Sequence, residues 1–208
     1  MHCGDAVTVW TSELQPFRAS FLLLEAAASA AYNDFVYRDE QQAGDVRGLL
    51  FDRAVAEFAE PYTSAIVGDG KLEGFISALS APELRLCRMR SALVIAKAGF
   101  FTQDPQLHRR MQLAGATNPP VEDGDVYVSR VAVGPEFSGR GRGGLLLGLV
   151  QEQAKARGAN RLTLEVESRN ERALTLYRKH DFKEGGQRVM NDPVTGRSLS
   201  LMHMAKAV

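Results

Sequence analysis

The segment VYVSRVAVGPEFSGRGRGG, from Val126 to Gly144, decides the fold and is read as a strand, a sharp turn and the start of a helix. β-Branched residues predominate up to Val133, which favours a strand, and Gly134–Pro135 ends it because proline cannot donate to a β-ladder. A helix is indicated after the turn by apolar residues at helical spacing: Leu145, Leu146, Leu147, Leu149 and Val150.

The turn between the strand and the helix is rich in glycine, with Gly139, Gly141, Gly143 and Gly144 close together. Glycine has no Cβ, so the backbone N–H groups of such a turn can come close to a ligand. The turn also precedes a helix N-terminus, where free N–H groups and the helix dipole attract anions. The segment therefore predicts a loop that holds phosphates through its backbone.

A dinucleotide-binding loop is the first alternative. Gly139, Gly141 and Gly144 match the spacing of that fingerprint, and Glu165 stands near the acidic position that it requires about 20 residues further on. The fingerprint belongs after the first strand of a βαβ unit, however, whereas this loop lies far along the chain. A Rossmann-type oxidoreductase is therefore the less favoured interpretation.

A second segment, LTLEVESRNERALTLYRKHDF from Leu162 to Phe182, decides between these alternatives. Together with the strand ending RVAV and the loop SGRGRG, it resembles the two cofactor-binding motifs of the GNAT family of N-acetyltransferases. The likeness is greatest to the ribosomal-protein alanine acetyltransferases and is loose outside the two segments. Two residues depart from the family pattern: Ser138, where the loop usually has Arg or Gln, and Asp181, where the last glycine usually stands.

The resemblance implies an α/β (α+β) fold, with a mixed, twisted sheet of roughly six to seven strands flanked by helices. It implies one N-acetyltransferase domain over residues 1–208, with residues 80–120 as a helical insertion between the third and fourth strands. It further implies acetyl-CoA as cosubstrate, no metal, direct attack by an amine-bearing acceptor that is a small molecule or a protein, and a homodimer.

The resemblance also assigns the site residues. Tyr177 is the expected general acid, and Glu165 is the expected base, with water as the alternative. The strand is expected to contact the pantetheine arm and the developing oxyanion through its backbone, and the loop the phosphates. The expected cofactor-binding residues are Val131, Ala132, Val133, Ser138, Gly139, Arg140, Gly141, Arg142, Gly143, Gly144 and Asn170.

Simpler roles stay open for several of these residues. Tyr177 also fits the apolar stripe of its helix, and Glu165 could be solvated beside Glu167 or paired with a basic neighbour. The arginines of the loop, Arg140 and Arg142, could serve solubility alone. A non-catalytic module that binds or senses acyl-CoA is accordingly the alternative to an enzyme.

Composition narrows the classes of protein. The 208 residues include 25 basic and 25 acidic residues, which argues against a nucleic-acid-binding protein that relies on a strong positive field. The most apolar stretch, Ala19–Ala31, contains Glu25 and is too short for a membrane span. Cys3 and Cys87 form neither a metal-ligand spacing nor a disulfide framework, which favours a cytoplasmic protein with reduced thiols. Together with the charge balance and the lack of a long apolar stretch, this predicts no membrane or nucleic-acid partner.

Local patterns predict the remaining elements. We expect a first strand at residues 7–10, a helix from Pro16 to Tyr37, a loop at residues 39–48, and a second helix capped by Asp45. A hairpin at residues 64–79 is predicted around the turn Gly68–Lys71, with a bulge at Gly74. Further expected elements are helices within residues 80–120, a helix from Gly143 to Arg157, a strand from Arg161 to Glu167, a helix from Asn170 to Lys179, and strands at 187–190 and 198–204.

Overall fold

The computed structural model describes residues 11–59, 62–116 and 120–208. These residues form one six-stranded sheet with the order β1-β2-β3-β4-β6-β5. Its strands are β1 (Thr63–Gly68), β2 (Lys71–Ser80), β3 (Asp125–Val133), β4 (Arg161–Glu167), β5 (Lys183–Asn191) and β6 (Ser198–Ala207). Only β3 and β4 are parallel neighbours, so the sheet is mixed, as predicted.

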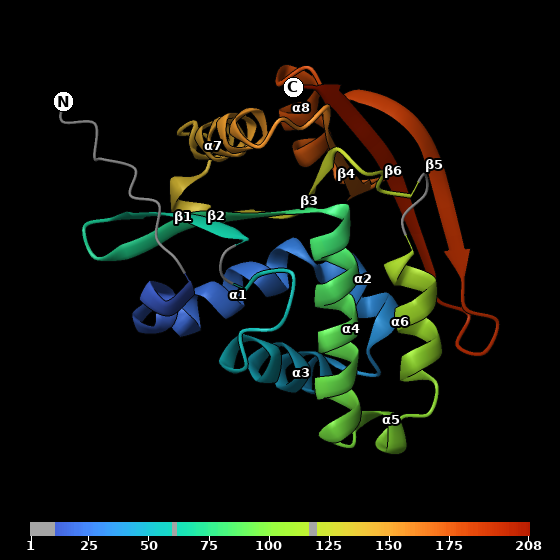
Figure 1. Cartoon of the computed structure of the whole chain (residues 1–208). Coiled ribbons are helices and arrows are strands. Elements are labelled where there is room, and N and C mark those ends of the chain that lie inside the picture. Colours follow the sequence, from blue (N-terminus) through green and yellow to red (C-terminus); the bar gives the residue numbers. More distant parts are fainter. Residues whose placement is uncertain (1–10, 60–61, 117–119) are drawn as a thin grey trace.

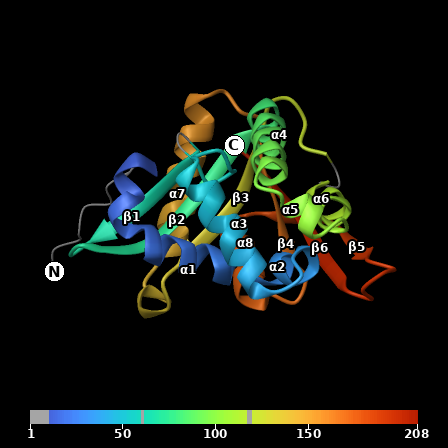
Figure 2. The ribbon, with the colours of Figure 1, turned by 90° about the horizontal axis from the view of Figure 1, so that it is seen from below.

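Helices cover both faces of the sheet (Figure 1). One face carries α7 (Arg142–Ala156) and α8 (Glu171–Lys179). The other face carries the helices that precede β3, which Figure 2 shows from below. These are the 3₁₀ helix η1 (Thr11–Phe17), α1 (Arg18–Ala28), α2 (Ala30–Val36), α3 (Glu40–Asp52), α4 (Ala81–Lys97), α5 (Phe100–Gln103) and α6 (Leu107–Gly115).

Each face of the sheet has its own hydrophobic core. On the α7/α8 face, Leu146 and Val150 of α7 pack against Leu162 and Leu164 of β4. On the other face, the core includes several phenylalanines, and Phe21 of α1 stacks on Phe75 of β2 with ring centroids 4.2 Å apart. The sheet therefore separates two hydrophobic cores, and a cavity that connects its two faces has to pass between strands.

The N-terminal helices differ from the sequence prediction at two places. The helix expected from Pro16 to Tyr37 is interrupted at Ser29, whose hydroxyl donates to Glu25 at 2.8 Å. The prediction of a loop at residues 39–48 is wrong, because α3 covers nearly all of these residues. Asp39 is the N-cap of this helix, and its carboxylate accepts the N–H of Gln42 at 2.8 Å. Asp45, the predicted cap, lies inside α3.

Packing explains why α3 forms despite two glycines. Val46 and Phe51 are buried in the core, and such tertiary contacts outweigh the weak helix propensity of glycine. At Gly48 an added Cβ would lie 3.1 Å from the guanidinium of Arg18, so this glycine lets α1 approach closely. The helix ends before Ala54, which has a positive φ of 48°.

The predicted hairpin is confirmed. β1 and β2 pair around Asp69–Gly70, and their register shifts next to Gly74, where a bulge was expected. An added Cβ at Gly74 would lie 2.6 Å from the carbonyl oxygen of Ala132, so only glycine allows β3 to come this close.

Residues 80–120 are helical where the structure describes them, as predicted, and comprise α4, α5 and α6. On α4, Met89 and Leu93 face outward, whereas Ile95 is buried. The helix expected from Gly143 to Arg157 is confirmed as α7, and Asp181 adopts the positive φ of 66° expected in place of glycine. The strand expected at residues 7–10 lies outside the described residues.

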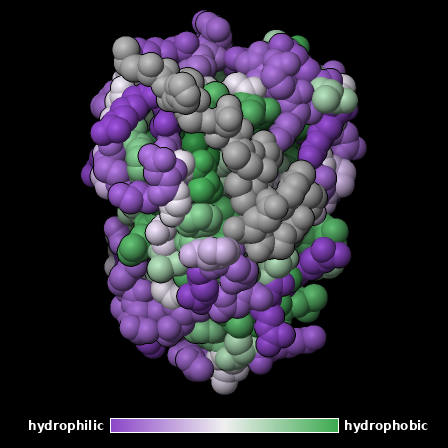
Figure 3. Space-filling view, turned by 90° about the vertical axis from the view of Figure 1, so that its left-hand side faces the viewer, coloured by the Kyte–Doolittle hydropathy of each residue, from purple (hydrophilic) through white to green (hydrophobic). Residues whose placement is uncertain are grey.

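The surface at the β1 end is mostly hydrophilic, with hydrophobic residues in a band down the middle of this face (Figure 3). Within the described residues, no helix is both long and apolar enough to span a membrane.

Candidate active site

The site begins where β3 and β4 separate. Their parallel pairing runs only from Asp125 with Arg161 to Val128 with Leu164. At the same point β3 bulges, because Val128 and Arg130 pair with consecutive residues of β2 and leave Ser129 without a partner. Beyond Val128 the edge of β3 that faces β4 is therefore open, and it includes the predicted pantetheine-binding residues Val131 to Val133.

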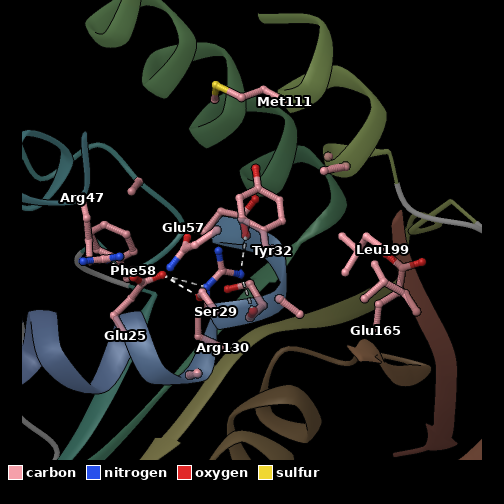
Figure 4. A pocket seen from close by; sticks show the side chains of 18 of the residues that line it. Glu25, Ser29, Tyr32, Arg47, Glu57, Phe58, Met111, Arg130, Glu165 and Leu199 are labelled. Atoms are coloured by element: carbon pink, nitrogen blue, oxygen red, sulfur yellow. Dashed lines mark hydrogen bonds and ion pairs between the residues drawn. The ribbon is translucent and has the colours of Figure 1, made fainter. Parts of the chain in front are cut away.

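A cavity of about 500 Å³ passes through this gap. Asn170, Ala173 and Tyr177 line it on the α8 side, and Tyr32 of α2 and Met111 of α6 line it on the other face of the sheet. Figure 4 shows the part of the cavity that lies between α2, α4 and α6. One continuous space thus connects the two faces of the sheet.

The glycine loop lies at the N-terminus of α7. Gly139 and Gly141 have φ of 74° and 78°, and an added Cβ at either meets no atom within 4 Å. Gly141 is the N-cap residue of α7 and provides no side-chain acceptor. The first N–H groups of the helix, which have no intrahelical acceptor, are therefore not capped by a side chain. This geometry is suited to an anion.

Gly143 and Gly144 also have a packing role, which the sequence did not indicate. An added Cβ would lie 2.9 Å from Leu176 at Gly143 and 2.8 Å from His180 at Gly144. Both contacts are with α8, so these two glycines let the two helices pack closely. Their backbone N–H groups still belong to the first turn of α7.

The arginines near the loop differ in their side-chain partners. Arg142 forms an ion pair with the buried Glu73 at 2.5 Å, so its charge is already balanced. Arg140 is exposed and has no side-chain partner among the described residues. Arg172, on the first turn of α8, donates a hydrogen bond to the hydroxyl of Ser138. A basic residue from a different helix therefore lies beside the position where Ser138 departs from the family pattern, and nothing in the local sequence indicated this contact.

Tyr177 is buried on α8 and borders the cavity. Its ring meets Phe182 edge-on at 5.7 Å, and in the described chain its hydroxyl has no hydrogen-bond partner. Burial raises the pKa of this phenol above its ordinary value, which keeps it protonated. Asn170 lies about two helix turns earlier and caps α8, since its side chain accepts the N–H of Ala173 at 3.1 Å.

Glu165 and Glu167 border the cavity from β4. The side chain of Glu165 is only 4% exposed and pairs with Arg188 of β5 at 3.2 Å. This corresponds to the basic-neighbour alternative considered from the sequence. Glu167 is half-buried, and its side chain forms no hydrogen bond or ion pair within the described residues. Burial and the charge of Glu165 raise the pKa of Tyr127, which also borders the cavity.

Of the described histidines and cysteines, His108 borders the cavity, whereas His180, His203 and Cys87 do not. His203 is buried behind Glu165, and burial lowers its pKa. His180 packs against α7, and Cys87 is a free, buried thiol. Among the described residues, no group of three or more His, Cys, Asp or Glu side chains could hold a metal ion.

A comparison with family models decides the family. The model of the acetyltransferase (GNAT) family matches residues 30–182, which is more than half of the chain. The chain belongs to the GNAT family.

Two curated proteins match parts of the chain. A Bacillus subtilis (strain 168) protein with the provisional name ribosomal protein bS18-alanine N-acetyltransferase is 36% identical over 64 residues, which are 31% of this chain and 42% of that protein. An uncharacterized Mycobacterium leprae (strain TN) protein is 38% identical over 84 residues, 40% of this chain and 22% of that protein. The chain thus matches less than half the length of these curated relatives.

Solved structures confirm the GNAT fold. An N-acetyltransferase from Staphylococcus aureus Mu50 superposes with a TM-score of 0.63 at 18% identity, covering 92% of this chain and 97% of that one. A ribosomal-protein-alanine N-acetyltransferase from Brucella melitensis gives a TM-score of 0.58 at 16% identity, covering 98% and 99%. At such identities the likeness concerns the fold alone.

Proposed function

We propose that this GNAT protein is an acetyl-CoA-dependent N-acetyltransferase that transfers the acetyl group directly to a bound amine. The observation that carries the proposal is the cavity that crosses the sheet between β3 and β4. It joins the side of the α7 loop to the opposite face, so two substrates that enter from different sides can meet in it.

The residues present fit the cofactor. The uncapped N-terminus of α7 suits the pyrophosphate, with Arg140 and Arg172 as nearby positive charges. The open edge of β3 from Val131 to Val133 suits the pantetheine amides, which would pair with it like an added strand. When bound, acetyl-CoA would supply the activated acetyl thioester.

The chain's own groups would carry the protons and the charge. Free backbone N–H groups of β3 would stabilise the developing oxyanion. Tyr177, kept protonated by burial, would donate to the departing thiolate. Glu165, or a water molecule, would accept the proton of the amine, since an ammonium group has no lone pair with which to attack.

A non-catalytic acyl-CoA-binding module is the second candidate, and one observation favours it. The ion pair with Arg188 leaves the carboxylate of Glu165 less available to accept a proton. Catalysis would then depend on water or on Glu167, which has no such partner in the described structure.

Thiol release from acetyl-CoA distinguishes the two candidates. The protein is incubated with acetyl-CoA and a panel of amino acids, polyamines, lysine-containing peptides and peptides with a free N-terminal alanine. Amine-dependent thiol release that is lost in Tyr177→Phe supports the enzyme. Tight CoA binding by calorimetry, without amine-dependent release from any member of the panel, would leave the binding module.

A further inference from the structure

Five charged side chains form an alternating chain on the acceptor side of the cavity, away from α7 and α8. Glu25 lies between Arg47 at 2.6 Å and Arg130 at 3.1 Å. Glu57 lies between Arg130 at 3.8 Å and Arg88 at 3.0 Å. We call Arg47, Glu25, Arg130, Glu57 and Arg88 the charge chain; Figure 4 shows most of it on one side of the pocket and Glu165 on the other.

The charge chain carries an excess of one positive charge, because it has three guanidinium groups and two carboxylates. Nearby carboxylates do not offset this excess through close pairs. Glu167 borders the same cavity but forms no ion pair with the charge chain in the described structure. Glu165 is balanced by Arg188, and Glu40 reaches Arg47 only at 3.6 Å with a side chain that is 75% exposed. A buried excess charge is costly unless an opposite charge comes close.

The N–H donors of the charge chain that have no described partner belong to Arg88 and Arg130. The Nε atom of Arg88 donates to Glu57, and its two terminal nitrogens form no hydrogen bond or ion pair with a described residue. A third of the side chain is exposed, and Arg88 borders the cavity. Arg130 uses Nε and Nη1, which leaves Nη2 without a described partner.

Tyr32 adds a neutral donor beside these cations. The guanidinium of Arg130 lies 5.8 Å from the centre of its ring, and in the described residues no hydrogen bond involves its hydroxyl. Burial raises the pKa of this phenol to about 12, so that it stays protonated. The guanidinium groups and this hydroxyl all border the same cavity.

We propose that the acceptor is an amino acid or a close analogue, and that Arg88 and Arg130 bind its carboxylate while its amine lies toward Glu165 and Tyr177. Planar guanidinium groups match a carboxylate through paired hydrogen bonds. A single excess positive charge suits a monoanionic carboxylate better than a dianionic phosphate. This inference rests on the proposed acetyl transfer, whose second substrate it identifies by class.

The carboxylate is tested with matched acceptors. The twenty amino acids, their carboxamides and their aminophosphonate counterparts are compared by thiol release from acetyl-CoA. We expect the best acid to exceed its amide at least tenfold in kcat/KM, which corresponds to about 1.4 kcal/mol. Amides that react as well as the acids, or phosphonates that react better, would overturn the carboxylate while leaving the acetyltransferase intact.

Arg88 is tested separately with the best acid and its amide. Arg88→Gln should lower kcat/KM at least tenfold for the acid, chiefly through KM, and change it less than twofold for the amide. Arg85→Gln is the matched control, because Arg85 lies three residues earlier on α4 and its side chain is 66% exposed. Equal losses on acid and amide would indicate only a structural role for Arg88 and would count against the proposal.

A binding measurement separates this inference from the proposed function. The same acids and amides are titrated calorimetrically into the wild type and Arg88→Gln, with CoA present. Preference for the acid without turnover would support the carboxylate site and contradict acetyl transfer. Acetylation of alanine-terminated peptides but of no free amino acid would overturn the inference and retain the enzyme.

Discussion

The guanidinium of Arg188 holds the carboxylate of Glu165 at 3.2 Å, and it reaches the carbonyl oxygens of Leu113 and Ala114 at 3.0 Å and 3.5 Å as well. One β5 side chain therefore joins the candidate base to the end of α6. A proton taken up by Glu165 must compete with this cation, so any role in catalysis depends on Arg188.

Replacing Glu165 or Arg188 tests the candidate base and its ion-pair partner. Glu165→Gln should lower turnover about 100-fold, because the proton acceptor is lost. Arg188→Met should also lower turnover, because the carboxylate loses the side chain that holds it in place, whereas Arg188→Lys should lower turnover less. The measurement is kcat/KM from pH 5 to 9 with one amine.

An unchanged profile in Glu165→Gln would assign the proton to water or to another residue. Glu167→Gln is then measured in the same way, because Glu167 borders the cavity without a described side-chain partner. Loss of activity in that variant alone would identify Glu167, rather than Glu165, as the base.

Tyr177→Phe should reduce turnover about 100-fold and leave CoA affinity unchanged, because the ring contact with Phe182 is kept and only the donor is removed. The raised pKa of Tyr177 also implies that the wild type has no loss of activity from this phenol up to pH 10, its ordinary value. Steady-state kinetics and calorimetry check both parts. A Phe variant with wild-type turnover would leave Tyr177 as a core residue.

The two ends of α7 offer a matched test of the phosphate loop. Gly141 and Gly158 have φ of 78° and 67°, and an added Cβ meets no atom within 4 Å at either. Aspartate therefore strains the backbone similarly at both, but only Gly141→Asp puts a negative charge at the proposed phosphate site. CoA affinity should fall at least tenfold in that variant alone, a loss of about 1.4 kcal/mol. Equal affinities, measured by calorimetry on folded variants, would refute the loop assignment.

The turn between β5 and β6 should respond to acid. Burial of Asp192 opposes its ionisation, but hydrogen bonds from the Val194 amide, the Thr195 hydroxyl and Arg109 of α6 outweigh this effect and lower its pKa to about 2. A depressed pKa stabilises the fold above the unfolded value, near 3.8, and the benefit is lost as the pH falls toward 2.

Asp192→Asn should accordingly lower the urea midpoint at pH 6, and the difference from the wild type should shrink as the pH falls from about 4 to about 2. Asp45→Asn is a suitable control, because Asp45 is exposed on α3 and bonds only Gln41 at 2.8 Å. A difference that stays constant with pH would mean that Asp192 contributes through packing rather than charge.

Local patterns predicted much of the fold, for physical reasons. Strand β4 alternates in polarity, and α7 repeats its apolar residues at helical spacing, so each pattern reports which face is buried. The prediction was wrong at residues 39–48, because α3 depends on contacts of Val46 and Phe51 with distant elements. Gly44 and Gly48 favoured a loop in the sequence, and the sequence did not reveal those contacts.

Long-range charge pairs could not be predicted in the same way. Arg130 and Glu25 are 105 positions apart, and Arg188 and Glu165 are 23 apart. Neither pair has a spacing that a local rule detects, since the topology brings them together. The family motifs indicated Glu165 and Tyr177, whereas the partner of Glu165 and the charge chain required the folded structure.

The contact between Arg172 and Ser138 is another long-range contact that only the folded structure shows. We infer the role of Arg172 from this contact. Most relatives are expected to carry a basic or amide side chain at position 138, and here Arg172 reaches the hydroxyl of Ser138 from α8. If Arg172 supplies the missing charge, Arg172→Gln should weaken CoA binding by the equivalent of an exposed ion pair, about 0.2–1 kcal/mol. The loss should shrink at high salt, because the Debye length falls from about 10 Å at 0.1 M to about 3 Å at 1 M.

A double variant tests whether the charge or the hydrogen bond matters. Ser138→Ala removes the hydrogen bond and keeps the charge, so CoA affinity should stay close to that of the wild type. Ser138→Arg should restore affinity in the Arg172→Gln background, whereas in the wild type the new arginine would repel Arg172 and gain less. Arg53→Gln, an exposed residue after α3 on the other face of the sheet, controls for the loss of one positive charge. If calorimetry at low salt gives the same affinity with and without Arg172, the phosphates lie elsewhere, and Arg140 becomes the next residue to test.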